Sequence, residues 1–139
     1  MIDLFEGQEK RIKVHISAAD VASFTALSGD AAPLHVDRDF ARRAGYSEPV
    51  VHGALLAAYV SQLVGMEIPG KFSVMERIDL AFRHPCYAPC DLQIVGKVRQ
   101  ISEAVSSVVL DISIQDSTGR AVATGKTWHR ILDRSDSLE

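Results

Sequence analysis

Cysteine and aromatic residues are both scarce in this chain of 139 residues. There are two cysteines, Cys86 and Cys90, and aromatic side chains make up 6% of the sequence. Two cysteines form neither a disulfide framework nor, by themselves, a metal-binding signature, so we expect them to serve in packing. A cytoplasmic location is the corresponding expectation.

Charge clusters and signal-like segments are also missing. The formal net charge is -3, and the basic residues are scattered rather than arranged in a stripe, which argues against nucleic acid as a partner. The first residues have no basic segment followed by an apolar run, so we expect no signal peptide. The most apolar segment, 49–66, is interrupted by His52, Gln62 and two glycines. Its length suits a buried helix, and we expect no membrane partner.

What the chain does contain is typical of one globular domain, with 47% hydrophobic and 24% charged residues. Helix signals come first. Ser17 and Asp20 have capping-box spacing, and the helix that they open should end at Gly29. A short helix is expected over 38–44. A longer helix over 53–65 is apolar nearly all the way round, which predicts burial on most of its faces.

Strand signals fill the second half of the chain. From Phe72 onward apolar and polar residues alternate, a pattern that predicts an antiparallel sheet with one wet face. A turn is expected at 116–119, followed by a strand over 120–132. Helices followed by strands indicate an α+β fold, in which the sheet wraps around the apolar helix. We expect a single domain over 1–132 and a polar tail over 133–139.

The stretch 28–37, SGDAAPLHVD, combines an aspartate and a histidine with conformationally restricted neighbours. Gly29 permits a sharp turn, and Pro33 fixes one backbone dihedral. Such a loop could aim Asp30 and His35 at one spot, where a carboxylate and an imidazole would deprotonate a water and return a proton elsewhere. The structural alternative is an Asx-type turn at Asp30 and an ordinary polar loop residue at His35.

Other candidate residues surround the start of the apolar helix. His52-Gly53 opens it, where free N–H groups and a close backbone approach suit an oxyanion site, although Gly53 could simply permit tight packing. Ser61 lies further along and could bond only to its own backbone. A metal site is a weaker possibility, because no two histidines have zincin spacing; its ligands would be Asp30, His35, Asp37, Asp39 and His52. A nucleophile elbow, a dinucleotide fingerprint and a P-loop are all missing.

The segment from Phe24 to Gly65 resembles the hydratase-2 motif region of the MaoC-like dehydratases, which include R-specific enoyl-CoA hydratases. The family pattern runs Gly-Asp-x-Asn-Pro-aliphatic-His-x-Asp, then Ala-Gly-aromatic, then His-Gly at the start of the central helix. The chain matches it with the residues Gly29, Asp30, Pro33, Leu34, His35, Asp37, Ala44, Gly45, Tyr46, His52 and Gly53. Ala32 stands where the family has asparagine.

This resemblance implies a hot-dog fold, a homodimer or higher homo-oligomer, and a hydro-lyase acting on trans-2-enoyl or (R)-3-hydroxyacyl thioesters. It implies that Asp30 and His35 are the catalytic pair, and that Gly53 donates its N–H to the thioester carbonyl. His52 and Ser61 are expected in the substrate-binding set. The substrate would be an acyl-CoA or acyl-carrier thioester, as in fatty acid metabolism, and no metal or other cofactor is expected.

Two alternatives stay open at this point. Loss of the asparagine amide at Ala32 would suit a non-catalytic acyl-CoA-binding subunit. A hot-dog thioesterase is disfavoured, because such enzymes usually carry a carboxylate on the central helix and the segment 53–65 has none. Acyl chain length and pathway do not follow from the sequence.

Overall fold

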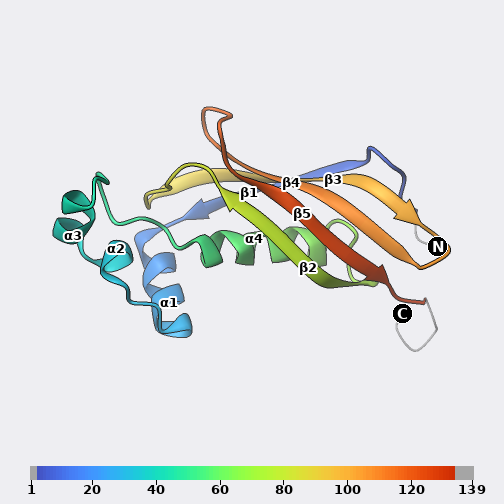
Figure 1. Cartoon of the computed structure of the whole chain (residues 1–139), viewed down its shortest axis with the longest axis horizontal. Helices are drawn as coiled ribbons and strands as arrows, with labels where there is room; N and C mark the ends of the chain where they lie inside the picture. Colours follow the sequence, from blue (N-terminus) through green and yellow to red (C-terminus); the bar gives the residue numbers. More distant parts are fainter. Residues whose placement is uncertain (1–2, 134–139) are drawn as a thin grey trace.

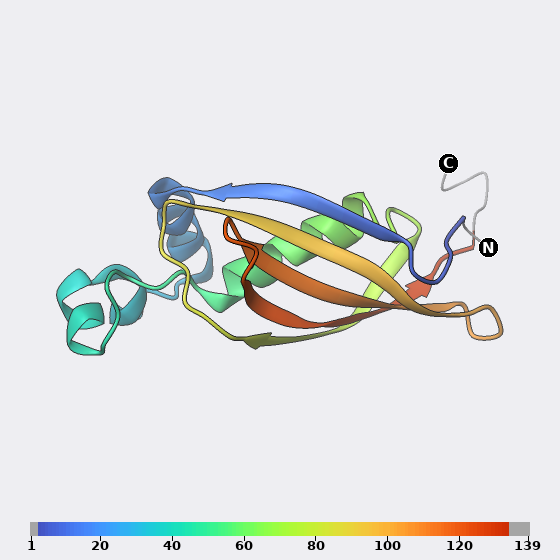
Figure 2. The same cartoon turned by 90° about the horizontal axis from the view of Figure 1, so that it is seen from above.

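A computed structural model describes residues 3–133, so the predicted polar tail, apart from Asp133, lies outside the described residues. Five strands form one antiparallel sheet of order β1-β3-β4-β5-β2, and α4 lies against one of its faces (Figures 1 and 2). In chain order the elements are β1 (Glu9–Ile16), α1 (Ala18–Ser28), α2 (Pro33–Val36), α3 (Arg38–Arg43), α4 (Gly53–Met66), β2 (Ser73–Phe82), β3 (Cys90–Ser102), β4 (Ser107–Asp116) and β5 (Ala121–Ile131).

The helix boundaries follow from local chemistry. Ser17 and Asp20 form the predicted capping box, and Gly29 ends α1 in a left-handed conformation with φ 74°. Pro33 occupies the first turn of the single-turn helix α2, where its missing N–H costs nothing. The side chain of Asp37 then caps α3 by accepting from the Phe40 N–H. The segment around Pro33, predicted as a loop, is therefore partly helical.

The core lies between the sheet and α4. Leu63, fully buried on α4, packs against Gly96 of β3: a methyl group at position 96 would lie 3.0 Å from Leu63 Cδ2. The absence of a side chain there brings helix and sheet together. The fully buried side chains include Ile16, Val60, Ile68, Ile94, Leu110 and Ile114.

One face of α4 is open, which corrects the prediction that this helix is buried on most faces. The sheet covers only one side of it, the side of Leu55, Val60 and Leu63. The other side carries small or polar residues, and Met66 near its end is 77% exposed. The exposed residues on this face are Ala54, Ala58, Ser61, Gln62 and Gly65. In a single copy of the chain, the alanine-rich stripe therefore faces outward.

The strand β2 forms one edge of the sheet and pairs only with β5. Three of its apolar side chains, Val74, Ile78 and Phe82, are exposed. The alternation that predicted a strand here was correct, but this edge strand is only partly covered by α4. A bulge between Met75 and Arg77 shifts its register.

The helices α2 and α3 extend beyond one end of the sheet, and α1 lies below that end (Figure 1). We call residues 18–52 the overhang. The helices α1 and α2 have no buried residue, and α3 has only Ala41. The remaining sheet and α4 form the body of the molecule, and the Asp30 loop lies in the overhang close to where it joins the body.

Candidate active site

Asp30 is held in a tight turn directly after α1. Its N–H donates to Ser28 Oγ at 3.1 Å, and its Oδ1 accepts from the Ala32 N–H at 3.2 Å. The Asx-type turn expected as the structural alternative is therefore present. It uses only one carboxylate oxygen, and the side chain remains 48% exposed. Oδ2 is left for another partner.

His35 on α2 presents one ring nitrogen to that oxygen. Its Nδ1 lies 2.6 Å from the Val50 carbonyl oxygen, which can only accept, so Nδ1 carries the hydrogen and Nε2 keeps a lone pair. Nε2 lies 3.8 Å from Asp30 Oδ2. That distance is too long for a direct hydrogen bond. It suits a water about 2.8 Å from each atom that donates one hydrogen to each.

His52 contacts both Asp30 and His35. Its ring is 1% exposed and stacks on His35, with centroids 4.0 Å apart and planes at 21°. Its Nε2–H donates to the Asp30 carbonyl oxygen at 2.8 Å, and Phe24 packs edge-on against the ring. Because Ala32 offers no amide side chain, the loop is fixed instead by His52 and Ser28. His52 was predicted in the substrate-binding set; in the structure it is buried and contacts Asp30 and His35.

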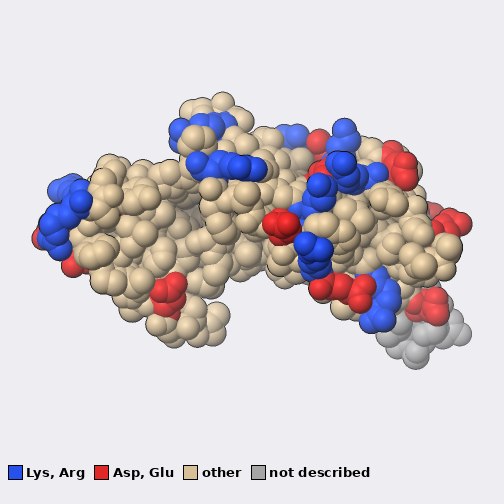
Figure 3. Space-filling model, viewed as in Figure 1, with Lys and Arg blue, Asp and Glu red and all other residues tan. Residues whose placement is uncertain are grey.

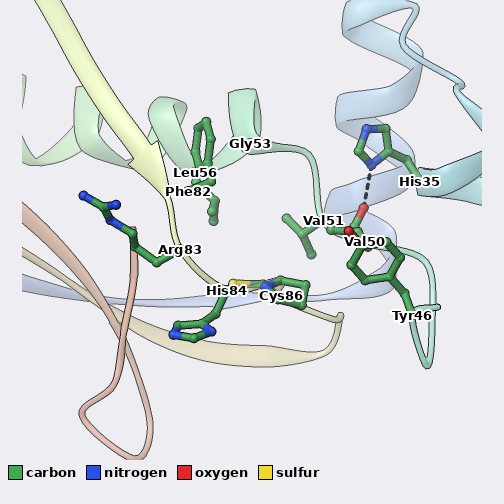
Figure 4. A pocket seen from close by; sticks show the side chains of 11 residues that line it. His35, Tyr46, Val50, Val51, Gly53, Leu56, Phe82, Arg83, His84 and Cys86 are labelled. Carbon is green, nitrogen blue, oxygen red and sulfur yellow. Dashed lines mark hydrogen bonds between the residues drawn. The ribbon is translucent and has the colours of Figure 1, made fainter. Parts of the chain in front are cut away.

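A cavity of about 300 Å³ opens beside His35 (Figure 4). Gly53 at the start of α4 lines it, and among residues 3–133 no acceptor is found for the Gly53 N–H. A methyl group at this position would lie 2.8 Å from Phe82 Cζ, so the glycine also permits close packing. The remaining lining is mainly apolar, with Tyr46, Val50, Val51, Leu56, Phe82, Arg83, His84, Pro85 and Cys86.

Cys86 in the cavity wall is not an activated nucleophile. Burial, with a smaller contribution from Cys90, raises the pKa of its thiol to about 11. The thiol is therefore protonated at neutral pH. Burial likewise raises the pKa of the Cys90 thiol.

The structure brings together most of the predicted site residues. Asp30, His35 and His52 form one cluster, and Gly53 lines the same cavity as His35. Ser61 does not line this cavity and is exposed on the open face of α4. The cavity residues Arg83, His84 and Cys86 were not predicted as site residues, since they come from the chain between β2 and β3 and carry no local motif.

The cluster also resembles a metal-ligand set, because ligand atoms of Asp30, His35 and His52 lie within 4.8 Å of one another. Asp37 caps α3, and no such cluster in the described chain includes Asp37 or Asp39. One nitrogen of each histidine already donates to a carbonyl. These bonds leave the second nitrogen of each ring, His35 Nε2 and His52 Nδ1, and His52 Nδ1 has no hydrogen-bond partner among the described residues. Metal-ligating histidines are oriented by the same kind of bond, so the geometry fits an ion as well as a water.

The arrangement defines a hot-dog protein in which His35, with Asp30 beside it, lines an apolar cavity. Residues 5–115 match the family model described as the MaoC-like domain, and the chain belongs to this family. The predicted family and fold are both confirmed. No helix within residues 3–133 has the length and apolar character needed to cross a membrane.

Known relatives give the match more detail. Over 120 residues, 86% of this chain and 90% of the relative, it is 35% identical to an (R)-specific enoyl-CoA hydratase of Aeromonas caviae. Over 83 residues it is 34% identical to a 3-hydroxybutyryl-CoA dehydratase of Methylorubrum extorquens, covering 60% of this chain and 53% of that protein. The solved structure of the A. caviae (R)-hydratase superposes with a TM-score of 0.87 and 33% identity, covering 93% of this chain and 98% of the other.

Proposed function

We propose that this protein is a hydro-lyase that adds water to trans-2-enoyl thioesters to give (R)-3-hydroxyacyl thioesters, or catalyses the reverse dehydration. The observation that carries the proposal is the Asp30–His35 pair, spaced for one water, in which His35 lines the same apolar cavity as Gly53. The A. caviae relative is an (R)-specific enoyl-CoA hydratase, which supports the reaction class and its stereochemistry.

Asp30, His35 and Gly53 have separate roles in the proposed reaction. Asp30 Oδ2 and His35 Nε2 each accept one hydrogen of the water, and its oxygen bonds to C3 of the enoyl group as the water loses a proton to the pair. The C2–C3 π electrons shift towards the thioester, and negative charge develops on its carbonyl oxygen. The Gly53 N–H, at the positive end of α4, stabilises that oxygen. The pair then returns a proton to C2, so the atoms of one water are all accounted for.

The two alternatives have less support. Thioesterases of this fold usually carry a carboxylate on the central helix, and Gly53–Met66 contains no Asp or Glu. The argument for a non-catalytic subunit depended on a loop loosened by Ala32. The hydrogen bond from the Asp30 N–H to Ser28 and the one from His52 to the Asp30 carbonyl oxygen supply that restraint.

A homodimer and a cytoplasmic location belong to the same proposal. The unpaired edge of β2 exposes Val74, Ile78 and Phe82, and α4 offers its open face of small residues beside Met66. Pairing two β2 edges would cover both features, and exposed edges of this kind are rarely left bare. Free thiols at Cys86 and Cys90 suit a reducing compartment. Sedimentation should show a dimer that Ile78→Lys dissociates; a wild-type monomer would contradict it.

The reaction is tested by incubating the protein with trans-2-enoyl-CoAs of increasing chain length. We expect loss of the enoyl absorbance and formation of the R-3-hydroxyacyl product, and the series of substrates gives the preferred chain length. Release of free thiol would instead indicate hydrolysis. Binding of these thioesters without turnover would favour the non-catalytic alternative.

A further inference from the structure

Arg83 lies where the active-site cavity meets the outer face of the sheet. It directly follows β2, and its backbone N–H donates to the Val122 carbonyl oxygen. It lines the active-site cavity and also a second hollow of about 620 Å³. That hollow contains Thr124, Lys126 and Trp128 of β5, which alternate with the buried Thr127 and His129 and so lie on the sheet face away from α4.

Arg83 forms no ion pair with another residue in the described part of the chain. Its Nε–H donates to the neutral Thr124 hydroxyl at 3.2 Å. Five other arginines in the described part of the chain form ion pairs with carboxylates, namely Arg11, Arg38, Arg42, Arg99 and Arg120. Within residues 3–133, Arg83 has no carboxylate oxygen at 4.0 Å or less. Its terminal nitrogens remain available for an anion, and in Figure 4 they point away from His35.

Arg83 is also the only lysine or arginine that lines the active-site cavity, as far as the described residues go. Figure 3 shows basic side chains at the far end of the overhang and over the sheet, with a largely uncharged surface between them. An anion held partly in the cavity would therefore find one permanent positive charge, at the exit towards the outer face.

We propose that Arg83 binds the phosphate of the phosphopantetheine arm that carries the acyl thioester; this rests on the proposed function. The acyl group occupies the apolar cavity beside His35 and Gly53, and the arm leaves past Arg83. Coenzyme A and acyl carrier proteins share this anionic arm. A guanidinium forms bidentate, charge-assisted hydrogen bonds with phosphate, which are stronger than neutral ones.

Lys126 provides a matched control. It lies in the same outer hollow, but its cross-strand neighbours are Asp79 on β2 and Asp111 on β4. Its position differs from that of Arg83, because it does not line the active-site cavity. If any nearby positive charge were enough, Lys126 and Arg83 would matter equally.

The test measures calorimetric binding of butyryl thioesters, which have no double bond to hydrate. The carriers are pantetheine, 4′-phosphopantetheine, coenzyme A and an acyl carrier protein, and the proteins are wild type, Arg83→Gln and Lys126→Gln. We expect Arg83→Gln to weaken binding of the phosphorylated esters about tenfold and to leave the pantetheine ester within twofold. Lys126→Gln should change neither. The tighter of the coenzyme A and carrier-protein esters identifies the source of the arm.

Three results would overturn the assignment: equal weakening of the pantetheine ester, weakening of the coenzyme A ester alone, or no change for Arg83→Gln. The proposed reaction is judged separately with crotonyl-pantetheine, which lacks the phosphate. If Arg83→Gln hydrates this ester at the wild-type rate, the substitution has not disturbed Asp30 and His35, and any change in binding belongs to Arg83 itself. Failure of the wild type to hydrate any crotonyl thioester would refute the reaction, while the butyryl binding data would still decide the role of Arg83.

Discussion

The overhang and the body are stabilised by different kinds of contact. The body has a continuous apolar core in which Leu63, Ile94 and Leu110 are fully buried. In the overhang, α1 and α2 bury no residue. Val51 belongs to the core, Val21 and Phe24 pack partly buried against it, and hydrogen bonds from His35 and His52 hold the loops. The proposed acid–base pair, Asp30 and His35, thus lies on the less deeply packed part of the chain. Substitutions in the body should change stability, whereas those in the overhang should change catalysis.

The largest effect on stability is expected for Leu63→Ala. Removing a fully buried leucine that packs on Gly96 leaves a cavity and should lower the free energy of unfolding by about 2–5 kcal/mol. Urea denaturation measures this. The matched control is Leu27→Ala on α1, where the leucine is 87% exposed and the change should stay within about 0.5 kcal/mol. Similar losses at both positions would remove the contrast between the two regions.

The second prediction concerns the buried His129 in the body. Burial lowers the pKa of its ring from the ordinary 6.5 to about 4, so between these pH values the unfolded chain binds a proton that the folded chain does not. The free energy of unfolding should therefore fall by about 3 kcal/mol as the pH drops from 6.5 to 4. Below pH 4 this contribution levels off.

Denaturation curves across this pH range provide the test. His129→Gln keeps a hydrogen-bonding partner for Thr127 but cannot titrate, and it should flatten that part of the profile. An unchanged slope in His129→Gln would show that other groups, such as the carboxylates, cause the acid sensitivity. The exposed His15, which pairs with Asp91, gives the control variant His15→Gln.

A smaller effect is expected in the overhang for His52→Phe. Phenylalanine retains a ring that can stack on His35 but loses the N–H that donates to the Asp30 carbonyl. We expect kcat to fall about tenfold, a change near 1.4 kcal/mol, with little change in KM. Steady-state kinetics with crotonyl-CoA measures both constants. Phe24→Leu keeps the hydrogen bond from His52 to the Asp30 carbonyl and should reduce kcat less. A larger loss of kcat in Phe24→Leu than in His52→Phe would show that packing of the rings is what matters.

The smallest effect is expected from metal removal. Because the proposed mechanism uses only a water, the Asp30–His35 pair and the Gly53 N–H, dialysis against EDTA should leave the hydration rate unchanged. Loss of activity that added Zn²⁺ restores would mean that Asp30, His35 and His52 act as metal ligands. Measuring bound metal by mass spectrometry before and after dialysis makes the result unambiguous.

The features encoded over short distances were predictable from the sequence. The capping box at Ser17 and the Gly29 turn depend on neighbouring residues, and the motif from Asp30 to His35 carries the spacing of the pair. The α+β hot-dog fold followed from helix and strand periods together with the resemblance. The strand Glu9–Ile16 was missed because its sequence, EKRIKVHI, interleaves charges in a manner typical of an edge strand.

Features that depend on how distant segments meet were not predictable. The apolar character of 53–65 says nothing about which side the sheet covers, so the open face with Ser61 was missed. The role of His52 depends on a carbonyl 22 residues earlier in the chain. Arg83 and Cys86 reach the cavity only because the chain after β2 passes beside the start of α4.

The most direct test of the acid–base pair is a double-mutant cycle with Asp30→Asn and His35→Gln on crotonyl-CoA hydration. Each single variant should lower kcat/KM by about 10²–10⁴-fold. The double variant should be scarcely slower than either, because the two residues act on one water. Asp39→Asn, an exposed aspartate nearby on α3, serves as control and should retain the wild-type rate. Full activity in Asp30→Asn, or independent and additive losses, would contradict the shared role of Asp30 and His35.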